Sequence, residues 1–69
     1  MVDIKLRDEY IKLGQAIKAA GLVESGADAK SEIQESKVKV NGQIETQRGK
    51  KLHEGDIVDY EGQQIRIVK

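Results

Sequence analysis

The sequence predicts one small α+β domain over residues 1–69, with two short packed helices followed by a small, mostly antiparallel β-sheet. Three observations support this fold class. Apolar residues in the first half recur at the three- and four-residue spacing of a helix face. After residue 37, apolar and polar residues alternate as they do in half-buried strands. Turn signals that contain Gly separate these alternating stretches, which is typical of β-hairpins.

The first half of the chain is expected to begin with a strand and a helix. Residues 2–6 alternate apolar and polar side chains, which indicates a strand. The helix after it should end at Gly21, a suitable C-cap. Its start is open, because Asp8 could be the N-cap whereas residues 10–13 also fit an extended chain. Gly14 lies beside the apolar face, where it could permit close helix packing or simply weaken the helix. The apolar face of this helix is expected to be formed by Tyr10, Leu13, Ile17 and Ala20.

A second short helix is expected to follow the first after a loop of about five residues. Ser25 is a suitable N-cap, and Asp28 stands at the position where a capping box has its acidic residue. Ala29 and Ile33 are four residues apart and should form the inner face of this helix. Because the connection is short, the two helices are expected to pack as a pair.

The second half is expected to consist of β structure. Val38 and Val40 can point into a core while Lys39 points outward, since strand side chains alternate. Asn41-Gly42 is the strongest short-range hairpin signal, because both turn residues must accept a positive φ. The first and last strands of the chain are expected to pair and tie the termini together. The strands expected in this half are residues 38–40, 43–48, 57–60 and 65–68.

Charge is distributed unevenly although the 12 basic and 12 acidic residues give a net charge of zero. Residues 37–51 carry five basic side chains and one acidic side chain, which gives a local charge of +4. Residues 1–35 and 52–69 each carry a charge of −2. Because a local field steers ligands more than the net charge does, the predicted hairpin is expected to attract a phosphate-rich partner.

The composition argues against several classes of function. The chain has no Cys, so it offers no thiolate nucleophile or thiolate metal site. His53 is the only His and has no convincing catalytic partner, and no Gly-rich phosphate loop is present. With no Phe or Trp, a base-stacking platform for single strands is not expected. No apolar run approaches a membrane span in length. We therefore expect a cytoplasmic, monomeric non-enzyme without cofactor or metal.

Several motifs, taken in order, resemble a known family. They are Ser25-Gly26-Ala27-Asp28-Ala29-Lys30, then Ile33, then Val38-Lys39-Val40-Asn41-Gly42, then Gly55-Asp56. Over roughly residues 8–62, the chain resembles the RNA-binding domain named after small-subunit ribosomal protein S-four. Residues 21–26 and 48–52 resemble more particularly its short stand-alone bacterial subgroup. Many members have an RNA-contacting Arg where this chain has Gly26, so no RNA contact is expected from that position. Ser36 stands where Gly is usual in the family.

The resemblance implies a non-catalytic protein that binds structured RNA, by analogy ribosomal or transfer RNA, either as free RNA or within the ribosome. The implied processes are ribosome assembly, translation or RNA handling. A basic surface on the helix pair and the hairpin would make the contacts. Shape and phosphate recognition with little sequence specificity is expected, because side chains read the A-form major groove poorly and Lys suits phosphate. The expected RNA-binding residues are Lys30, Lys37, Lys39, Arg48, Lys50 and Lys51.

Two other classes of protein fit part of the sequence. A ubiquitin-like sulfur carrier is also short, but it needs a C-terminal Gly-Gly and a long central helix, whereas this chain ends in Ile67-Val68-Lys69. A protein–protein adaptor could place the same cations against an acidic partner, and the sequence does not decide between this function and RNA binding. The lysines could also simply solvate the surface. Binding to naked RNA would distinguish the RNA-binding protein from the adaptor.

Overall fold

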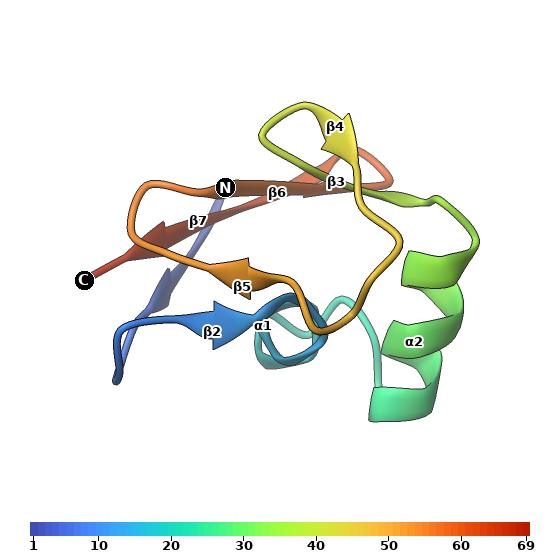
Figure 1. Cartoon of the computed structure of the whole chain (residues 1–69), viewed down its shortest axis with the longest axis horizontal. Coiled ribbons are helices and arrows are strands. Elements are labelled where there is room, and N and C mark those ends of the chain that lie inside the picture. The colour runs from blue at the N-terminus through green and yellow to red at the C-terminus, as the bar shows by residue number, and fades with distance from the viewer.

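The computed structural model describes all of residues 1–69. Two helices and seven short strands form two layers (Figure 1). A five-stranded sheet makes one layer, and the helices with a separate two-stranded sheet make the other. Neither helix is long and apolar enough to cross a membrane. The elements are β1 (Val2–Lys5), β2 (Ile11–Lys12), α1 (Leu13–Ala19), α2 (Gly26–Gln34), β3 (Val38–Val40), β4 (Gln43–Ile44), β5 (Lys51–Leu52), β6 (Ile57–Tyr60) and β7 (Gln63–Val68).

The five-stranded sheet has the strand order β1-β7-β6-β3-β4. β1 pairs with β7 in parallel, and the other three pairs are antiparallel. The predicted fold class and the predicted pairing of the first and last strands are therefore confirmed. The Asp3 carboxylate on β1 accepts two hydrogen bonds from the Arg66 guanidinium on β7, at 3.1 and 3.2 Å. This ion pair raises the pKa of Arg66.

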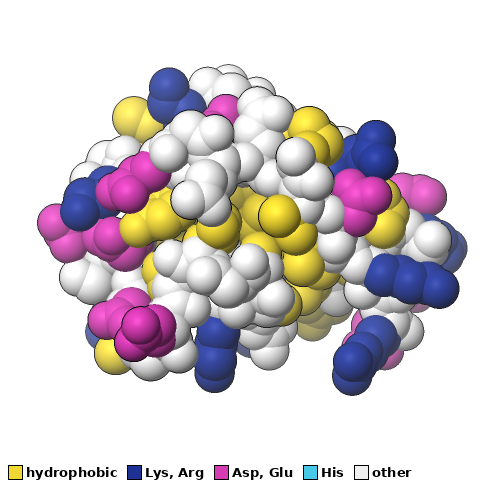
Figure 2. Space-filling view, turned by 180° about the vertical axis from the view of Figure 1, so that it is seen from behind, with side chains coloured by type: hydrophobic (Ala, Val, Ile, Leu, Met, Phe, Trp, Pro, Cys, Tyr) yellow, Lys and Arg dark blue, Asp and Glu magenta, His cyan; other side chains and the backbone are white.

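The core lies between the two layers and consists only of hydrophobic side chains. Leu13, Ile17 and Ile33 come from the helices and are fully buried. They meet buried aliphatic side chains of the sheets, namely Val38, Leu52, Val58, Ile65 and Ile67. Figure 2 shows further hydrophobic side chains reaching the surface in a band across the face opposite to that of Figure 1. No polar or charged residue is buried, so every Lys and Arg side chain lies at the surface.

The start of α1 differs from one of the two readings of the sequence. The helix begins at Leu13, and Asp8 does not cap it. Residues 11–12 form β2, which pairs with β5 in the register Ile11↔Leu52 and Lys12↔Lys51. The first helical N–H groups are satisfied by backbone instead, because Leu13 donates to the Lys50 carbonyl at 2.8 Å and Gly14 donates to the Arg48 carbonyl at 3.0 Å. Tyr10 consequently lies before the helix and is 38% exposed, so its predicted place on the inner helix face is wrong.

Two strands of the second half also have different bounds from those expected. β4 ends at Ile44 instead of residue 48. The Glu45 carboxylate accepts the N–H groups of Thr46 and Gln47 at 3.1 Å, which turns the chain out of the sheet. Residues 45–50 then cross from the five-stranded sheet to β5, beside α1 (Figure 1). β7 begins at Gln63, two residues earlier than expected.

The cap of α2 and the hairpin turn have the predicted conformations, whereas α1 ends at Ala19 with Ala20 as its C-cap, and Gly21 follows with a φ of 77°. The Ser25 hydroxyl accepts the Asp28 N–H at 3.1 Å, which confirms Ser25 as the N-cap of α2. Ser36 has a φ of 64°, the left-handed conformation for which Gly is the usual residue. Asn41 has a φ of 51° and leads into the hairpin turn before Gly42.

Asn41 also joins its own turn to the next one. Its side-chain amide donates to Asp56 Oδ1 at 3.0 Å, and its side-chain oxygen accepts the Ile57 N–H at 2.9 Å. Asp56 Oδ2 accepts the His53 N–H at 2.7 Å. Partial burial raises the pKa of Asp56, but these hydrogen bonds outweigh burial and leave the pKa below its usual value. The hairpin is thus fixed to the 53–56 turn by side chains.

Candidate nucleic-acid interface

A groove lies where α1, the start of α2 and the 45–50 segment meet. It has a volume of about 330 Å³. Cations reach it from three elements: Lys12 from β2, Lys18 from α1 and Arg48 from the crossing segment. No acidic side chain lines it. We call it the basic groove, and its lining residues are Lys12, Gly14, Gln15, Lys18, Gly26, Ala29, Arg48 and Gly49.

Gly14 makes the groove possible. A Cβ atom at Gly14 would lie 3.4 Å from the Arg48 Cβ, 3.6 Å from the Arg48 carbonyl oxygen and 3.9 Å from the Ala29 Cβ. The absence of a side chain therefore lets Arg48 and α2 approach α1 closely, which is one of the two roles that the sequence left open for this glycine. Lys18 is four residues beyond Gly14, so it lies on the same side of α1. The backbone bond from Gly14 to Arg48 fixes the position of the crossing segment.

The two-stranded sheet extends this positive charge. Lys12 and Lys51 are direct cross-strand partners and both are exposed. Like charges placed directly opposite each other are unfavourable in a sheet unless an anion lies between or beside them. Lys50 and Lys51 also line a second hollow of about 330 Å³ beside the hairpin, and unlike the basic groove this hollow has two acidic lining residues, Glu45 and Asp56. Together the basic groove and the two-stranded sheet form a surface suited to an extended anion.

The structure brings some of the predicted cations to this surface and places others elsewhere. Arg48 lines the groove, and Lys50 and Lys51 follow it directly. Lys30 is exposed on α2, one turn after Gly26 and therefore near the groove edge. Lys39 lies on the outer face of the five-stranded sheet, where it is paired with Asp59 of β6 and Ile44 of β4.

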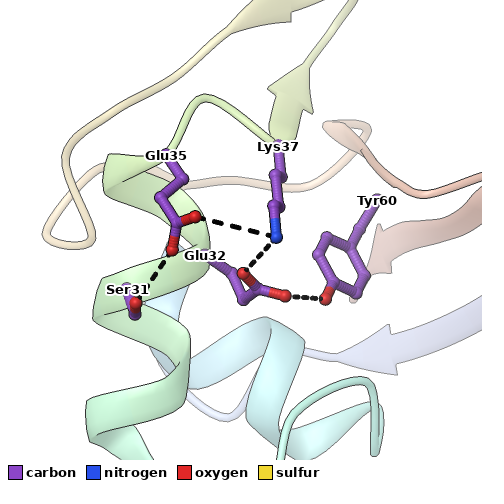
Figure 3. A network of polar contacts seen from close by, with 5 residues as sticks. All are labelled: Ser31, Glu32, Glu35, Lys37 and Tyr60. Atoms are coloured by element: carbon purple, nitrogen blue, oxygen red, sulfur yellow. Dashed lines mark hydrogen bonds and ion pairs between the residues drawn. The ribbon is translucent and has the colours of Figure 1, made fainter.

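Lys37 has partners within the protein (Figure 3). Its ammonium group lies 3.0 Å from Glu32 Oε2 and 3.8 Å from Glu35 Oε1. The Tyr60 hydroxyl donates to the other Glu32 oxygen at 2.5 Å. The hydrogen bond from Tyr60 and then the one from Lys37 lower the pKa of Glu32, whereas the carboxylate of Glu32 raises the pKa of Lys37. The hydrogen bond between Tyr60 and Glu32 also raises the pKa of Tyr60 to about 12. Lys37 therefore fastens the start of β3 to α2.

α2 separates this acidic region from the basic groove. Asp28, Glu32 and Glu35 recur at three- and four-residue spacing on one flank of the helix. Gly26 and Lys30 lie on the other flank, toward the groove. In Figure 2, several acidic side chains lie at the left, the side of the molecule where α2 lies, and others lie at the right beside Lys and Arg side chains. The two flanks of α2 thus differ in charge, although the whole chain is neutral.

Sequence reasoning missed two of the groove cations, Lys12 and Lys18. Both lie in the first half of the chain, whose charge as a segment is −2, so counting charge along the sequence did not reveal them. A usable signal was present in the helical spacing, because Lys18 follows Gly14 by four residues and a close approach at Gly14 was one of the two possibilities that the sequence left open. Lys12 required knowledge of the pairing between β2 and β5.

The fold and the site define a small α+β domain whose helix pair carries a basic groove. The chain belongs to the S4 domain family, because the family described as "S4 domain" matches residues 4–68. "Probable ribosome maturation protein RlbA" of Bacillus subtilis (strain 168) is 42% identical over 59 residues, which cover 86% of this chain and 83% of the relative. "Putative RNA-binding protein YbcJ" of Escherichia coli (strain K12) is 37% identical over 59 residues, or 86% and 84% of the two chains.

A solved structure shows the same fold over the whole chain. The solution structure of YbcJ from E. coli matches with a TM-score of 0.76 and 34% identity, covering 100% of this chain and 89% of that chain. That structure is described as revealing an "alfaL" motif involved in RNA binding. The family resemblance predicted from the sequence is therefore confirmed.

Proposed function

We propose that this protein is a non-catalytic RNA-binding module that grips structured RNA through the basic groove and the adjoining two-stranded sheet. The observation that carries the proposal is the convergence of Lys12, Lys18 and Arg48 on a groove that has no acidic lining residue. Both named relatives support it, since one is called an RNA-binding protein and the other a ribosome maturation protein.

The chemistry of the groove suits phosphate more than base edges. Lys provides a mobile point charge with three donors, whereas planar bidentate recognition needs Arg. The surface contains a single Arg, Arg48, among several Lys. A-form RNA is recognised mostly by its shape, phosphates and 2′-hydroxyl groups. We therefore infer recognition of RNA shape with little sequence specificity.

The contacting residues we propose differ in part from those expected from the sequence alone. Lys30, Arg48, Lys50 and Lys51 remain, because they lie in or beside the groove region. Lys12 and Lys18 are added to them. We propose that Lys37 stabilises the junction of α2 and β3 instead of contacting RNA, since two carboxylates hold it. Lys39 would contribute little, because it faces Asp59 on the outer sheet face.

The proposed target is ribosomal or transfer RNA, and the proposed setting is ribosome assembly, translation or RNA handling in the cytoplasm. Support for this setting comes from the name of the Bacillus subtilis relative, which refers to ribosome maturation. The fold itself does not specify a process, since the same fold can serve several functions.

The binding of naked RNA at a series of salt concentrations tests the proposal. With four to six phosphates neutralised at roughly 0.7–0.9 per contact, the slope of log K against log salt concentration should be about −3 to −5 for a structured ribosomal RNA fragment. A slope near zero, or no binding to naked RNA, would contradict the proposal. Binding only in the presence of an acidic protein would support the protein–protein adaptor instead.

A further inference from the structure

The outer face of the two-stranded sheet carries an aromatic ring next to the cations. In the register Ile11↔Leu52 and Lys12↔Lys51, the residues flanking these pairs, Tyr10 and His53, come next to each other. Their ring centroids are 6.3 Å apart, with the ring planes tilted by 52°. Because strand side chains alternate, Tyr10 and Lys12 project from one face while Ile11 points toward the core. The same face therefore presents Tyr10, Lys12, Lys51 and His53.

Tyr10 is the exposed aromatic side chain of this protein. The chain has no Phe or Trp, and its other tyrosine, Tyr60, is only 7% exposed and has its hydroxyl bonded to Glu32. Tyr10 is 38% exposed and borders two surface hollows of about 470 and 500 Å³, which lie on the Asp8 side of the ring and are not lined by Lys12 or Lys51. The ring thus has open space beside it, which a buried core tyrosine would not have.

A cation already contacts this ring. The Lys51 ammonium nitrogen lies 4.9 Å from the centroid of Tyr10. Exposed cation–π contacts are weak, and the residue directly across from Lys51 is another cation, Lys12. Lys51 can therefore exchange the ring for a phosphate group at little cost. When it does so, a face of Tyr10 becomes free for another planar group.

We propose that this face, formed by Tyr10, Lys12 and Lys51, is a subsite for one unpaired nucleotide of the RNA. The base stacks on Tyr10, and its flanking phosphate lies between Lys12 and Lys51. Tyr10 and Lys12 are two residues apart in an extended segment, about 7 Å, so both groups of one nucleotide can be reached. Every base has a π face, so this stacking does not require a particular base.

The subsite rests on the proposed function and narrows its target. One aromatic ring can hold one base, so the protein would not coat single strands. The subsite is continuous with the basic groove, because Lys12 belongs to both. The RNA that fits both is a helix interrupted by an unpaired nucleotide, in which the groove contacts the phosphates of the paired region.

A matched pair of RNA hairpins tests this inference. One hairpin carries a single bulged 2-aminopurine, and the other is fully paired and otherwise identical. Both are titrated with the wild-type chain, Tyr10→Phe and Tyr10→Ala, with Val2→Ala as the control. Val2 is similarly exposed, at 41%, but lies on β1 outside the two-stranded sheet. Thermal unfolding of each variant checks that the fold is intact.

The expected result is a preference of the wild-type chain and Tyr10→Phe for the bulged hairpin, with 2-aminopurine fluorescence quenched on binding. Tyr10→Ala should lose about tenfold in affinity for the bulged hairpin, within the range for loss of a stacked base, and should lose the quenching. Its affinity for the paired hairpin should be unchanged. Equal losses on both hairpins, or no loss, would overturn the subsite and leave the proposed function standing. Failure of the wild-type chain to bind either hairpin would overturn both.

Discussion

Replacing Lys12, Lys18 and Arg48 by Ala is expected to weaken binding to a structured RNA by roughly one hundred- to five hundred-fold at about 0.1 M salt. Each phosphate contact contributes about 0.7–0.9 to the slope of log K against log salt, so three lost contacts remove about two to nearly three decades at that concentration. All three side chains line the basic groove and are exposed, so the fold should be retained. Filter binding or fluorescence anisotropy across a salt series measures the effect.

The matched control for this variant is Lys5→Ala/Lys39→Ala/Lys69→Ala, which changes the net charge by the same amount. These lysines are exposed and lie outside the residues that line the basic groove. The control should keep most of the affinity and a salt slope near that of the wild-type chain. Equal losses in the two variants would show that the total charge matters and that the groove does not. A larger loss in the control would favour the outer sheet face around Lys39.

Replacing Asn41 by Ala is expected to lower the free energy of unfolding by about 2–3 kcal/mol. The change removes the hydrogen bonds to Asp56 and to the Ile57 N–H, each worth about 0.5–1 kcal/mol at an exposed site. It also places a Cβ-bearing residue without a stabilising side chain at a φ of 51°, which costs about 1 kcal/mol. For a domain of this size, that is a large share of the total stability. Urea unfolding measures the difference.

Asn41→Gly separates the two causes. Gly tolerates the positive φ but makes neither side-chain bond, so it should be less destabilising than Ala. If both variants were as stable as the wild-type chain, the side-chain link between the two turns would have no energetic role.

The acid dependence of stability gives a second readout of the same link. The pKa of Asp56 is lower in the folded chain, so its stabilising contribution is present above the unfolded pKa near 3.8 and is lost as the pH falls through the folded pKa. Asp56→Asn should therefore flatten the loss of stability below about pH 4. Asp59→Asn is the comparison variant and should leave this acid dependence in place, because the Asp59 carboxylate accepts only the Gln64 amide and takes no part in the link between the two turns.

Local patterns in the sequence predicted most of the elements. The capping residues around Ser25, the hairpin at Asn41 and the alternation of Val38 with Val40 all act within a few residues, so each could be recognised in isolation. The start of α1 could not be fixed in that way. Its first N–H groups are satisfied by carbonyls of residues 48 and 50, which lie more than thirty residues away in the sequence. Residues 11–12 form a strand because they pair with β5, and this pairing joins segments that are far apart in the sequence.

The candidate site could be predicted only in part, because some of its residues are brought together by contacts between distant segments of the chain. Arg48, Lys50 and Lys51 are adjacent in sequence, so their cluster was visible as a run of charge. Lys12 and Lys18 reach that cluster through the β2–β5 pairing and the close packing at Gly14. Lys37 belongs to the same charge run, but the fold brings Glu32 within 3.0 Å of it. A count of charges along the sequence cannot show which lysines are paired with a carboxylate in the folded chain.

The most direct test of the basic groove is a two-dimensional ¹⁵N–¹H NMR titration of the wild-type chain with a structured ribosomal RNA fragment. The chain has 69 residues and no Pro, so nearly every position reports through its own amide. We expect the largest shifts at amides of the groove and the adjoining two-stranded sheet, centred on Lys12, Gly14, Lys18, Arg48 and Lys51. Amides on the acidic flank of α2, such as Asp28 and Glu32, should remain unchanged. Shifts concentrated on that flank or on the outer sheet face around Lys39, with the groove amides unmoved, would contradict the proposed interface.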